Sequence, residues 1–419
     1  MNSLKKLPTS FGFLFILYLL LGNIPRLWSR GAGDALNVLE PVIYSCSILY
    51  VIRHRAYAWK VQWVWACCGV ILFWILIGIL GSGMDLGAIA YAVRYVCTLI
   101  SGLALGTWMF VNWQHRSERV LSAFGFSYVA VALASFAILA LFPESVLLWQ
   151  FLALYGIEVN GDPHIGRLVS TYFDPNFYAA IIALPVLITG RSAIRQGGWR
   201  WLGFGILLAS CVLTVSRSGT AVLFMSAFVL FLPSLSRALY FMKVRYSTLG
   251  LLLVAVCAAG IVAALNVESL ERLVQRVGGT SSDDSALARL DSFDIGMRLI
   301  LERPFFGYGY NFSQALVVAQ RGIGLDSSVQ VILVSFGVIG AFVLLMICGL
   351  GWVQTHAALK RDSRHAGLFY LFSVYLFFAV LFGSNFNQLL FYPFWAIPCV
   401  ALGAYFSVCS KERGGQPWQ

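Results

Sequence analysis

Arginine occurs in several short polar motifs of an otherwise apolar chain. Arg167 lies in GRLVSTYFDPNF, Arg217 in TVSRSG and Arg289 in ARLDSFDIGMR. A guanidinium group stays charged, and its planar fork matches the oxygens of phosphate or carboxylate groups. Exposed arginines also form ordinary ion pairs with neighbouring acids, and such pairs stabilise a protein little. The motifs therefore predict an anion-binding site, with surface ion pairing as the alternative for any single arginine.

Arg94 differs from the others because it lies inside an apolar segment, AYAVRYVCTLI. A charged side chain at that depth in a membrane span is costly, and it normally faces a cavity or a partner. The alternative is that its long side chain reaches back to the membrane surface. We expect Arg94 to face a cavity or a partner within the bundle.

The elements that must position these residues are transmembrane helices. Of the 419 residues, 59% are hydrophobic and 11% are charged, whereas soluble domains average about 25% charged residues. The expected fold is therefore a single all-α polytopic membrane domain, residues 1–419. At roughly twenty residues a span, hydropathy predicts about twelve spans. They lie near 10–28, 35–52, 62–82, 87–112, 120–142, 175–190, 199–215, 218–234, 247–266, 328–351, 367–384 and 391–409, and 35–52 is weak because it contains Glu40.

Charge predicts how these spans are oriented. Every lysine falls in a segment on one side of the predicted spans: Lys5, Lys6, Lys60, Lys243, Lys360 and Lys411. The positive-inside rule places that side, and with it both termini, in the cytoplasm. The two larger outer loops are then 143–175 and 267–327. The net charge of +11 thus reflects topology, and no nucleic-acid reading motif accompanies it.

Metal and cofactor chemistry has little support in the sequence. The nine cysteines lack the spacing of metal ligands, and small apolar packing explains them. Asp283 and Asp284 lie in GGTSSDDS, which is typical of a solvated segment rather than of a carboxylate metal site. We expect neither a metal nor a cofactor.

Four segments resemble a known family when they are taken in order. They are GRLVSTYFDPNFYAAIIALP, LASCVLTVSRSGTAVL, ARLDSFDIGMRLILERPFFGYGYNF and SSVQVILVSFGVIGAFVLL. Together they resemble the superfamily of O-antigen ligases and Wzy-type polymerases, which are GT-C-like integral membrane glycosyltransferases. The resemblance extends from about Arg94 to Gly340.

This resemblance implies transfer of a glycan from an undecaprenyl-diphosphate donor at the periplasmic face of a bacterial inner membrane. In such proteins, arginines of the outer loops and of the Ser-Arg turn engage the diphosphate without a metal. The matching positions here are Arg167, Arg217 and Arg289, with Arg94 as their buried partner. The further candidates for substrate binding lie in the same motifs or in FGYGYN: Asn176, Arg298, Tyr308 and Tyr310.

The chain departs from the ligase pattern at the end of the second outer loop. Ligases of this superfamily carry a histidine there, which is interpreted as the base that activates the acceptor hydroxyl. This chain has Asp326-Ser327-Ser328 instead. Asp326 is our candidate base, with N-capping of the next span as the alternative. His164, in the other outer loop, is a weaker candidate base.

These features predict a polymerase that joins lipid-linked oligosaccharide repeat units, with the undecaprenyl-diphosphate glycan as both donor and acceptor. Membrane lipids surround it, and a chain-length regulator is a further candidate partner. The alternatives are a ligase that transfers the glycan to lipid A-core or to a protein, and a transporter. A transporter has less support because the chain shows no inverted repeat of broken spans.

Overall fold

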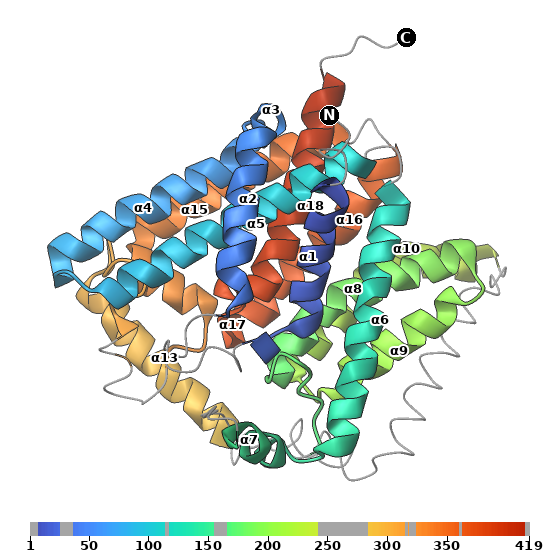
Figure 1. The fold of residues 1–419 in the computed structure, drawn as a ribbon, viewed down its shortest axis with the longest axis horizontal. Coiled ribbons are helices and arrows are strands. Elements are labelled where there is room, and N and C mark those ends of the chain that lie inside the picture. The colour runs from blue at the N-terminus through green and yellow to red at the C-terminus, as the bar shows by residue number, and fades with distance from the viewer. Residues whose placement is uncertain are drawn as a thin grey trace.

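A computed structural model describes residues 7–25, 37–113, 117–154, 166–241, 284–314, 317, 324–359 and 363–414. Every regular element in these ranges is helical (Figure 1). The α-helices are α1 (Leu7–Leu21), α2 (Leu39–Arg53), α3 (Arg55–Ala58), α4 (Gln62–Ser82), α5 (Leu86–Trp113), α6 (Ser117–Leu141), α7 (Ser145–Ala153), α8 (Pro175–Gln196), α9 (Arg200–Leu213), α10 (Arg217–Phe241), α13 (Asp284–Glu302), α15 (Ser328–Leu359), α16 (Ser363–Phe378), α17 (Ser384–Phe386) and α18 (Pro393–Gly414). A π-helical turn, Ala379–Gly383, and a 3₁₀ turn, Leu389–Phe391, link α16, α17 and α18.

The helices confirm a multi-pass membrane protein by their length and composition. Within the described ranges, seven helices are long and apolar enough to cross a membrane, and they lie in α4, α5, α6, α8, α15, α16–α17 and α18. Three shorter apolar helices, Phe11–Leu21, Arg200–Leu213 and Arg217–Leu230, match three more predicted spans. The predicted count of about twelve is not confirmed. The span at 35–52 corresponds to α2, a helix of only 15 residues that carries Glu40, and 247–266 lies outside the described residues.

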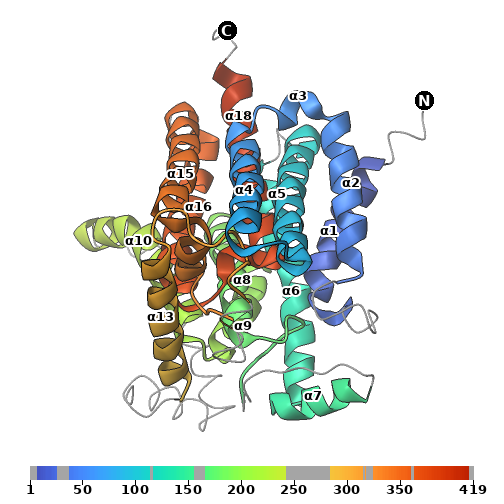
Figure 2. The same ribbon diagram turned by 90° about the vertical axis from the view of Figure 1, so that its left-hand side faces the viewer.

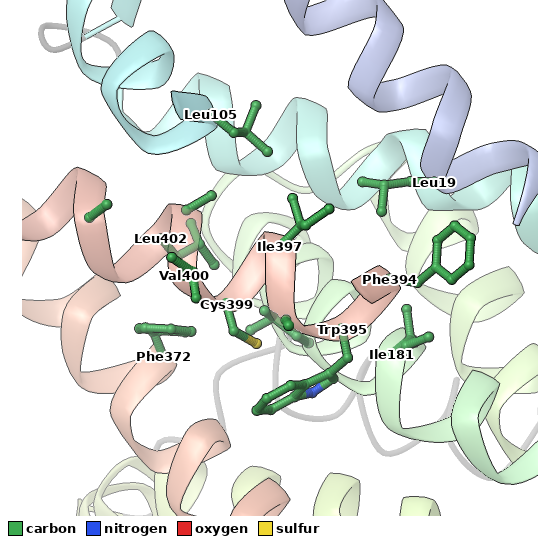
Figure 3. Close-up of a cluster of buried hydrophobic side chains, with 14 of the residues drawn as sticks. Leu19, Leu105, Ile181, Phe372, Phe394, Trp395, Ile397, Cys399, Val400 and Leu402 are labelled. Atoms are coloured by element: carbon green, nitrogen blue, oxygen red, sulfur yellow. The ribbon is translucent and has the colours of Figure 1, made fainter. Parts of the chain in front are cut away.

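Helix α18 forms the centre of the bundle, and 94% of its apolar 18-residue stretch is buried. Side chains from α1, α5, α8 and α16 surround it in Figure 3. Close packing with α5 depends on two glycines four residues apart. A Cβ at Gly102 would lie 2.5 Å from the Cβ of Val400, and one at Gly106 would lie 2.4 Å from the carbonyl oxygen of Ala401. Small residues at this spacing let helix backbones approach closely within a membrane.

Helix α15 is broken at Gly337, where φ is 64° and ψ is −175°. The backbone groups that the break frees are paired by the turn 304–309. The amide of Tyr308 donates to the carbonyl of Val334 at 2.9 Å, and the amide of Val338 donates to the carbonyl of Pro304 at 2.8 Å. Such pairing is required because lipid offers no hydrogen bonds to exposed backbone. Gly307 and Gly309 have φ values of 65° and 90°, which glycine adopts without steric cost.

The polar site lies at the end of the bundle where α8, α10, α15 and α18 begin. Helices α7 and α13 lie towards this end, and α18 ends at the opposite one (Figures 1 and 2). Helix α7 falls within the predicted loop 143–175, and α13 falls within 267–327. Helices that begin together place their partly positive N-termini side by side.

Candidate functional site

Arg167 is a buried side chain fixed between two helix ends. Only 8% of it is exposed. Its Nε donates to the carbonyl of Thr214 at 2.9 Å, just after α9, and its Nη2 donates to Oδ1 of Asn176 at 3.0 Å, in the first turn of α8. A buried guanidinium group needs such partners. Arg167 therefore joins the start of α8 to the turn that precedes α10.

The turn before Arg217 is tightly built. Val215 has a φ of 51°, an unfavourable conformation for a β-branched residue. The Ser216 hydroxyl accepts from the amide of Gly219 at 3.3 Å and so caps α10. A Cβ at Gly219 would lie 2.2 Å from the Cβ of Ala179, so glycine lets α10 pack directly on α8. Strained residues of this kind concentrate at functional sites. They fix Arg217 as the first residue of α10, partly exposed at the end of the bundle.

Asn387 connects this turn to the start of α15. Its Nδ2 donates to the hydroxyl of Ser218 at 3.3 Å. Its carbonyl oxygen accepts from both the amide and the hydroxyl of Ser328, at 3.1 and 2.9 Å. Asn387 thereby contacts both Ser218, which follows Arg217, and Ser328, which lies two residues after Asp326.

Helix α13 places Arg289 against the same stretch. The Arg289 guanidinium lies over the ring of Phe386, 5.8 Å from its centre. Ser292 lies three residues further on, on the same face of α13, and its hydroxyl accepts from the backbone amide of Asp326 at 3.0 Å. Arg289 and Asp326 are therefore held on one side of α13.

Asp174 supplies a carboxylate at the centre of this arrangement. It caps α8 by accepting from the amides of Asn176 and Phe177, at 2.6 and 2.9 Å. Burial raises the pKa of the Asp174 carboxyl, while the two amides and then the Arg167 and Arg289 guanidinium groups oppose that rise. The contacts of Asn176, Asp174 and Asn387 bring together the segments that carry Arg167, Arg217 and Arg289. We call these three residues the arginine cluster. Its three positive charges suit an anionic ligand.

The start of α15 is capped by Ser327 rather than by Asp326. The Ser327 hydroxyl accepts from the amide of Gln330 at 3.3 Å and donates to the carbonyl of Ser384 at 3.2 Å. The capping role considered for Asp326 is therefore filled by its neighbour. Asp326 itself is partly buried, and the bond from its backbone amide to Ser292 holds it on the side of α13 that carries Arg289.

Arg94 lies in a separate polar cavity of about 220 Å³ next to the cluster. It forms a two-pronged ion pair with Glu40 of α2, in which Nε lies 2.6 Å from Oε2 and Nη2 lies 2.7 Å from Oε1. Arg94 thus has both a partner and a cavity. That partner is Glu40, however, and the cavity is lined by none of the three cluster arginines that the resemblance had assigned to it. Tyr310 lines the same cavity and stacks on Phe391, with ring centres 4.9 Å apart.

Two of the predicted substrate-binding residues lie elsewhere. Arg298 is exposed on α13, nine residues beyond Arg289, and nine helical steps of about 100° place it on the opposite face. Tyr308 is buried, and its hydroxyl donates to the carboxylate of Glu302. The Arg303 guanidinium lies 4.4 Å from the centre of its ring. Tyr308 therefore belongs to the packing of α13 on α15, and His164 lies outside the described residues.

Two residues of the site were not predicted from the sequence. Glu40 served only as evidence against a span, yet it is fully buried as the partner of Arg94. Asn387 lies in SNFNQ, a polar run between the predicted spans 367–384 and 391–409. A π-helical turn precedes this run, and such turns often mark functional sites. The polar run was the signal that could have identified Asn387.

The described ranges contain no group of three or more histidine, cysteine, aspartate or glutamate side chains placed to hold a metal ion. The charged groups that gather at the site are guanidinium groups and a few carboxylates.

A helical membrane protein with an arginine cluster at the ends of its spans is the class that fold and site define. Residues 202–345 match the model of the O-antigen ligase family, so this segment is similar to that family. The match includes Arg217, Arg289 and Asp326, whereas Arg94, Arg167 and Asn387 lie outside it. No curated protein matches the chain.

Proposed function

We propose that the protein polymerises undecaprenyl-diphosphate-linked oligosaccharide units into O-antigen, capsule or exopolysaccharide. The observation that supports this most is the gathering of Arg167, Arg217 and Arg289 from three separate segments. Two of these arginines lie in the part of the chain that matches the O-antigen ligase family. The match supports a membrane glycosyltransferase, and the cluster would supply a place for its lipid-diphosphate donor.

The arginine cluster acts on the leaving group. In the transfer, the bond between the sugar C1 and the diphosphate oxygen breaks, and the lipid diphosphate leaves with the electron pair. Its negative charge grows as that bond breaks. Fixed guanidinium groups stabilise this charge more in the transition state than in the bound donor, and that difference accelerates the reaction.

Asp326 acts on the acceptor. An acceptor hydroxyl forms the new bond to C1 and releases its proton to the Asp326 carboxylate, which passes it to water. The backbone amide of Asp326 is fixed by Ser292, so the carboxyl is positioned by the same helix that carries Arg289. An aspartate where ligases of the superfamily carry histidine favours extension of a glycan over its transfer to lipid A-core.

The test is to replace Arg217 or Arg289 with alanine in a strain that lacks its own polymerase. Removing a fixed hydrogen-bonding group that stabilises developing negative charge lowers the rate about 100-fold or more. Polysaccharide ladders should therefore collapse to single repeats. Arg195→Ala, at the opposite end of α8, is the matched control and should keep wild-type ladders. Ladders of wild-type length in both cluster variants would remove the arginines from the mechanism.

An O-antigen ligase is the second candidate, because that is the description of the matching family model. It would use the same donor and the same cluster with a different acceptor. Deletion of the gene distinguishes the two. A strain without the ligase accumulates long lipid-linked polymer, whereas a strain without the polymerase carries single repeats on its acceptor.

A further inference from the structure

The polar cavity beside Arg94 is lined mainly by amide side chains and aromatic rings. Its walls come from α5, from the start of α8, and from the segments 310–314 and 388–393. We call it the amide pocket, after its side chains Asn311, Gln314 and Gln388. At about 220 Å³, it is smaller than the roughly 300–1,000 Å³ of pockets that hold drug-sized ligands. It fits one small polar group.

The amide pocket is electrically neutral. Arg94 is the one charged residue among those that line it, and both prongs of its ion pair are directed to Glu40. Glu40 also accepts from the hydroxyls of Tyr18 and Tyr44, each at 3.2 Å. Because the arginine is already compensated, the pocket favours an uncharged ligand, unlike the arginine cluster.

The polar groups of the amide pocket match sugar hydroxyls. An amide side chain offers both donors and acceptors, as a hydroxyl group requires. Within the described part of the chain, no hydrogen bond engages the side-chain amide of Asn311 or Gln314. Asn311 is held at a φ of 66°, which fixes its position at the wall. Tyr310 and Phe391 add ring surfaces on which the apolar face of a sugar can pack.

The amide pocket shares its walls with the catalytic region. Phe177, which lines the pocket, directly follows Asn176, and Gln388, which also lines it, directly follows Asn387. In each segment, therefore, one residue contacts the region of the arginine cluster and the next residue lines the pocket. The Gln388 amide also donates to the carbonyl of Leu325, which directly precedes Asp326. A ligand in the pocket therefore lies next to the segment that carries the candidate base.

We propose that the amide pocket binds the terminal uncharged sugar of the acceptor glycan and presents its hydroxyl to Asp326. This proposal rests on the function proposed above. It gives the two substrates different sites: the donor diphosphate lies at the arginine cluster, and the neutral acceptor end lies in the amide pocket.

The test uses the free repeat-unit oligosaccharide, released by mild acid from the organism's own lipid-linked precursor. This probe has the acceptor sugar but no diphosphate. Its affinity for the purified full chain is measured by calorimetry for the wild type, Gln314→Ala and Asn311→Gly. Glycine keeps the left-handed backbone at position 311 while removing the amide. Each variant should bind about threefold to tenfold more weakly, the loss expected for one or two hydrogen bonds.

Two controls separate the sites. Gln354→Ala, exposed on the far part of α15, should leave the affinity unchanged, and so should Arg217→Ala because the probe carries no diphosphate. In transfer assays, Gln314→Ala should raise the KM for the oligosaccharide and leave kcat near that of the wild type.

Two results would overturn the proposal. If the wild type polymerises glycan and the double variant Gln314→Ala/Asn311→Gly binds the probe as tightly as the wild type does, the pocket proposal alone is rejected. A chain that makes no glycan bond in any assay would reject the acceptor role together with the proposed function.

Discussion

At the scale of single residues, the arginines of the site fall into two groups with different surroundings. Burial raises the pKa of the Asp174 carboxyl, and the Arg167 and Arg289 guanidinium groups of the arginine cluster oppose that rise. Arg94, in contrast, is compensated by Glu40 within the bundle. Removing one member of a buried pair leaves the other charge uncompensated and is strongly destabilising. The Glu40–Arg94 pair therefore holds the wall of the amide pocket rather than a charged ligand.

Asp326 gives the prediction that belongs to this scale. Asp326→Asn keeps the backbone amide that donates to Ser292 but removes the proton acceptor. General base catalysis contributes about 100-fold to 10,000-fold, so the turnover of purified protein on a defined lipid-diphosphate oligosaccharide should fall by that order. Ser327 provides the cap of α15, so the thermal stability should stay close to that of the wild type.

The stability readout makes the Asp326 result specific. A variant that polymerises at the full rate would exclude aspartate as the base. A variant that loses activity and unfolds early would instead assign Asp326 a structural role.

At the scale of elements, α13 is connected to the membrane helices at the break in α15. The first part of α15, up to Phe336, carries the residues that hold α13 and the 384–390 stretch. The turn 304–309 pairs with the backbone at the break. The position of Asp326 therefore depends on a helix that is interrupted at Gly337.

Gly337→Ala should disturb this connection. The residue has a φ of 64°, and a Cβ there would lie 2.3 Å from the carbonyl oxygen of Phe305. The strained backbone alone costs about 1–3 kcal/mol, so the thermal midpoint in detergent should fall. Gly349→Ala in the same helix is the matched control, since a Cβ there meets nothing within 4 Å. Equal midpoints for the two variants would show that the break has no role in stability.

At the scale of the whole molecule, a buried helix organises the spans around the site. Helix α18 lies among α1, α5, α8 and α16 (Figure 3). Its first residue, Pro393, lines the amide pocket. The packing of α5 on α18 therefore sets the distance between Arg94 and the 388–393 wall.

Gly106→Ala tests this packing. Its Cβ would lie 2.4 Å from the Ala401 carbonyl oxygen, and such overpacking typically costs about 1–3 kcal/mol. The yield of folded protein after detergent extraction should fall. Gly69→Ala in α4 adds the same methyl group where nothing lies within 4 Å, and its yield should match that of the wild type. A loss of equal size at both positions would contradict the close approach of α5 and α18.

Much of the architecture follows from local sequence. Long apolar runs predicted α4, α5, α6, α8, α15, α16 and α18, because a membrane span needs a continuous apolar stretch that can be read from the chain. The Gly307 and Gly309 turn and the capping of α8 by Asp174 follow from residue type in the same way. The predicted span at 35–52 is weak because of Glu40, and Glu40 proved to be the partner of a distant arginine.

The sequence by itself determined a helical membrane protein whose arginines recur in polar motifs. Only the tertiary structure decided which of those arginines meet. It gathered Arg167, Arg217 and Arg289, and it separated Arg298 onto the other face of α13. It also brought in Asn387 and Glu40, which no motif had marked. The physical reason is that membrane insertion depends on the local run of apolar residues, whereas a site depends on contacts between helices that are far apart in the chain.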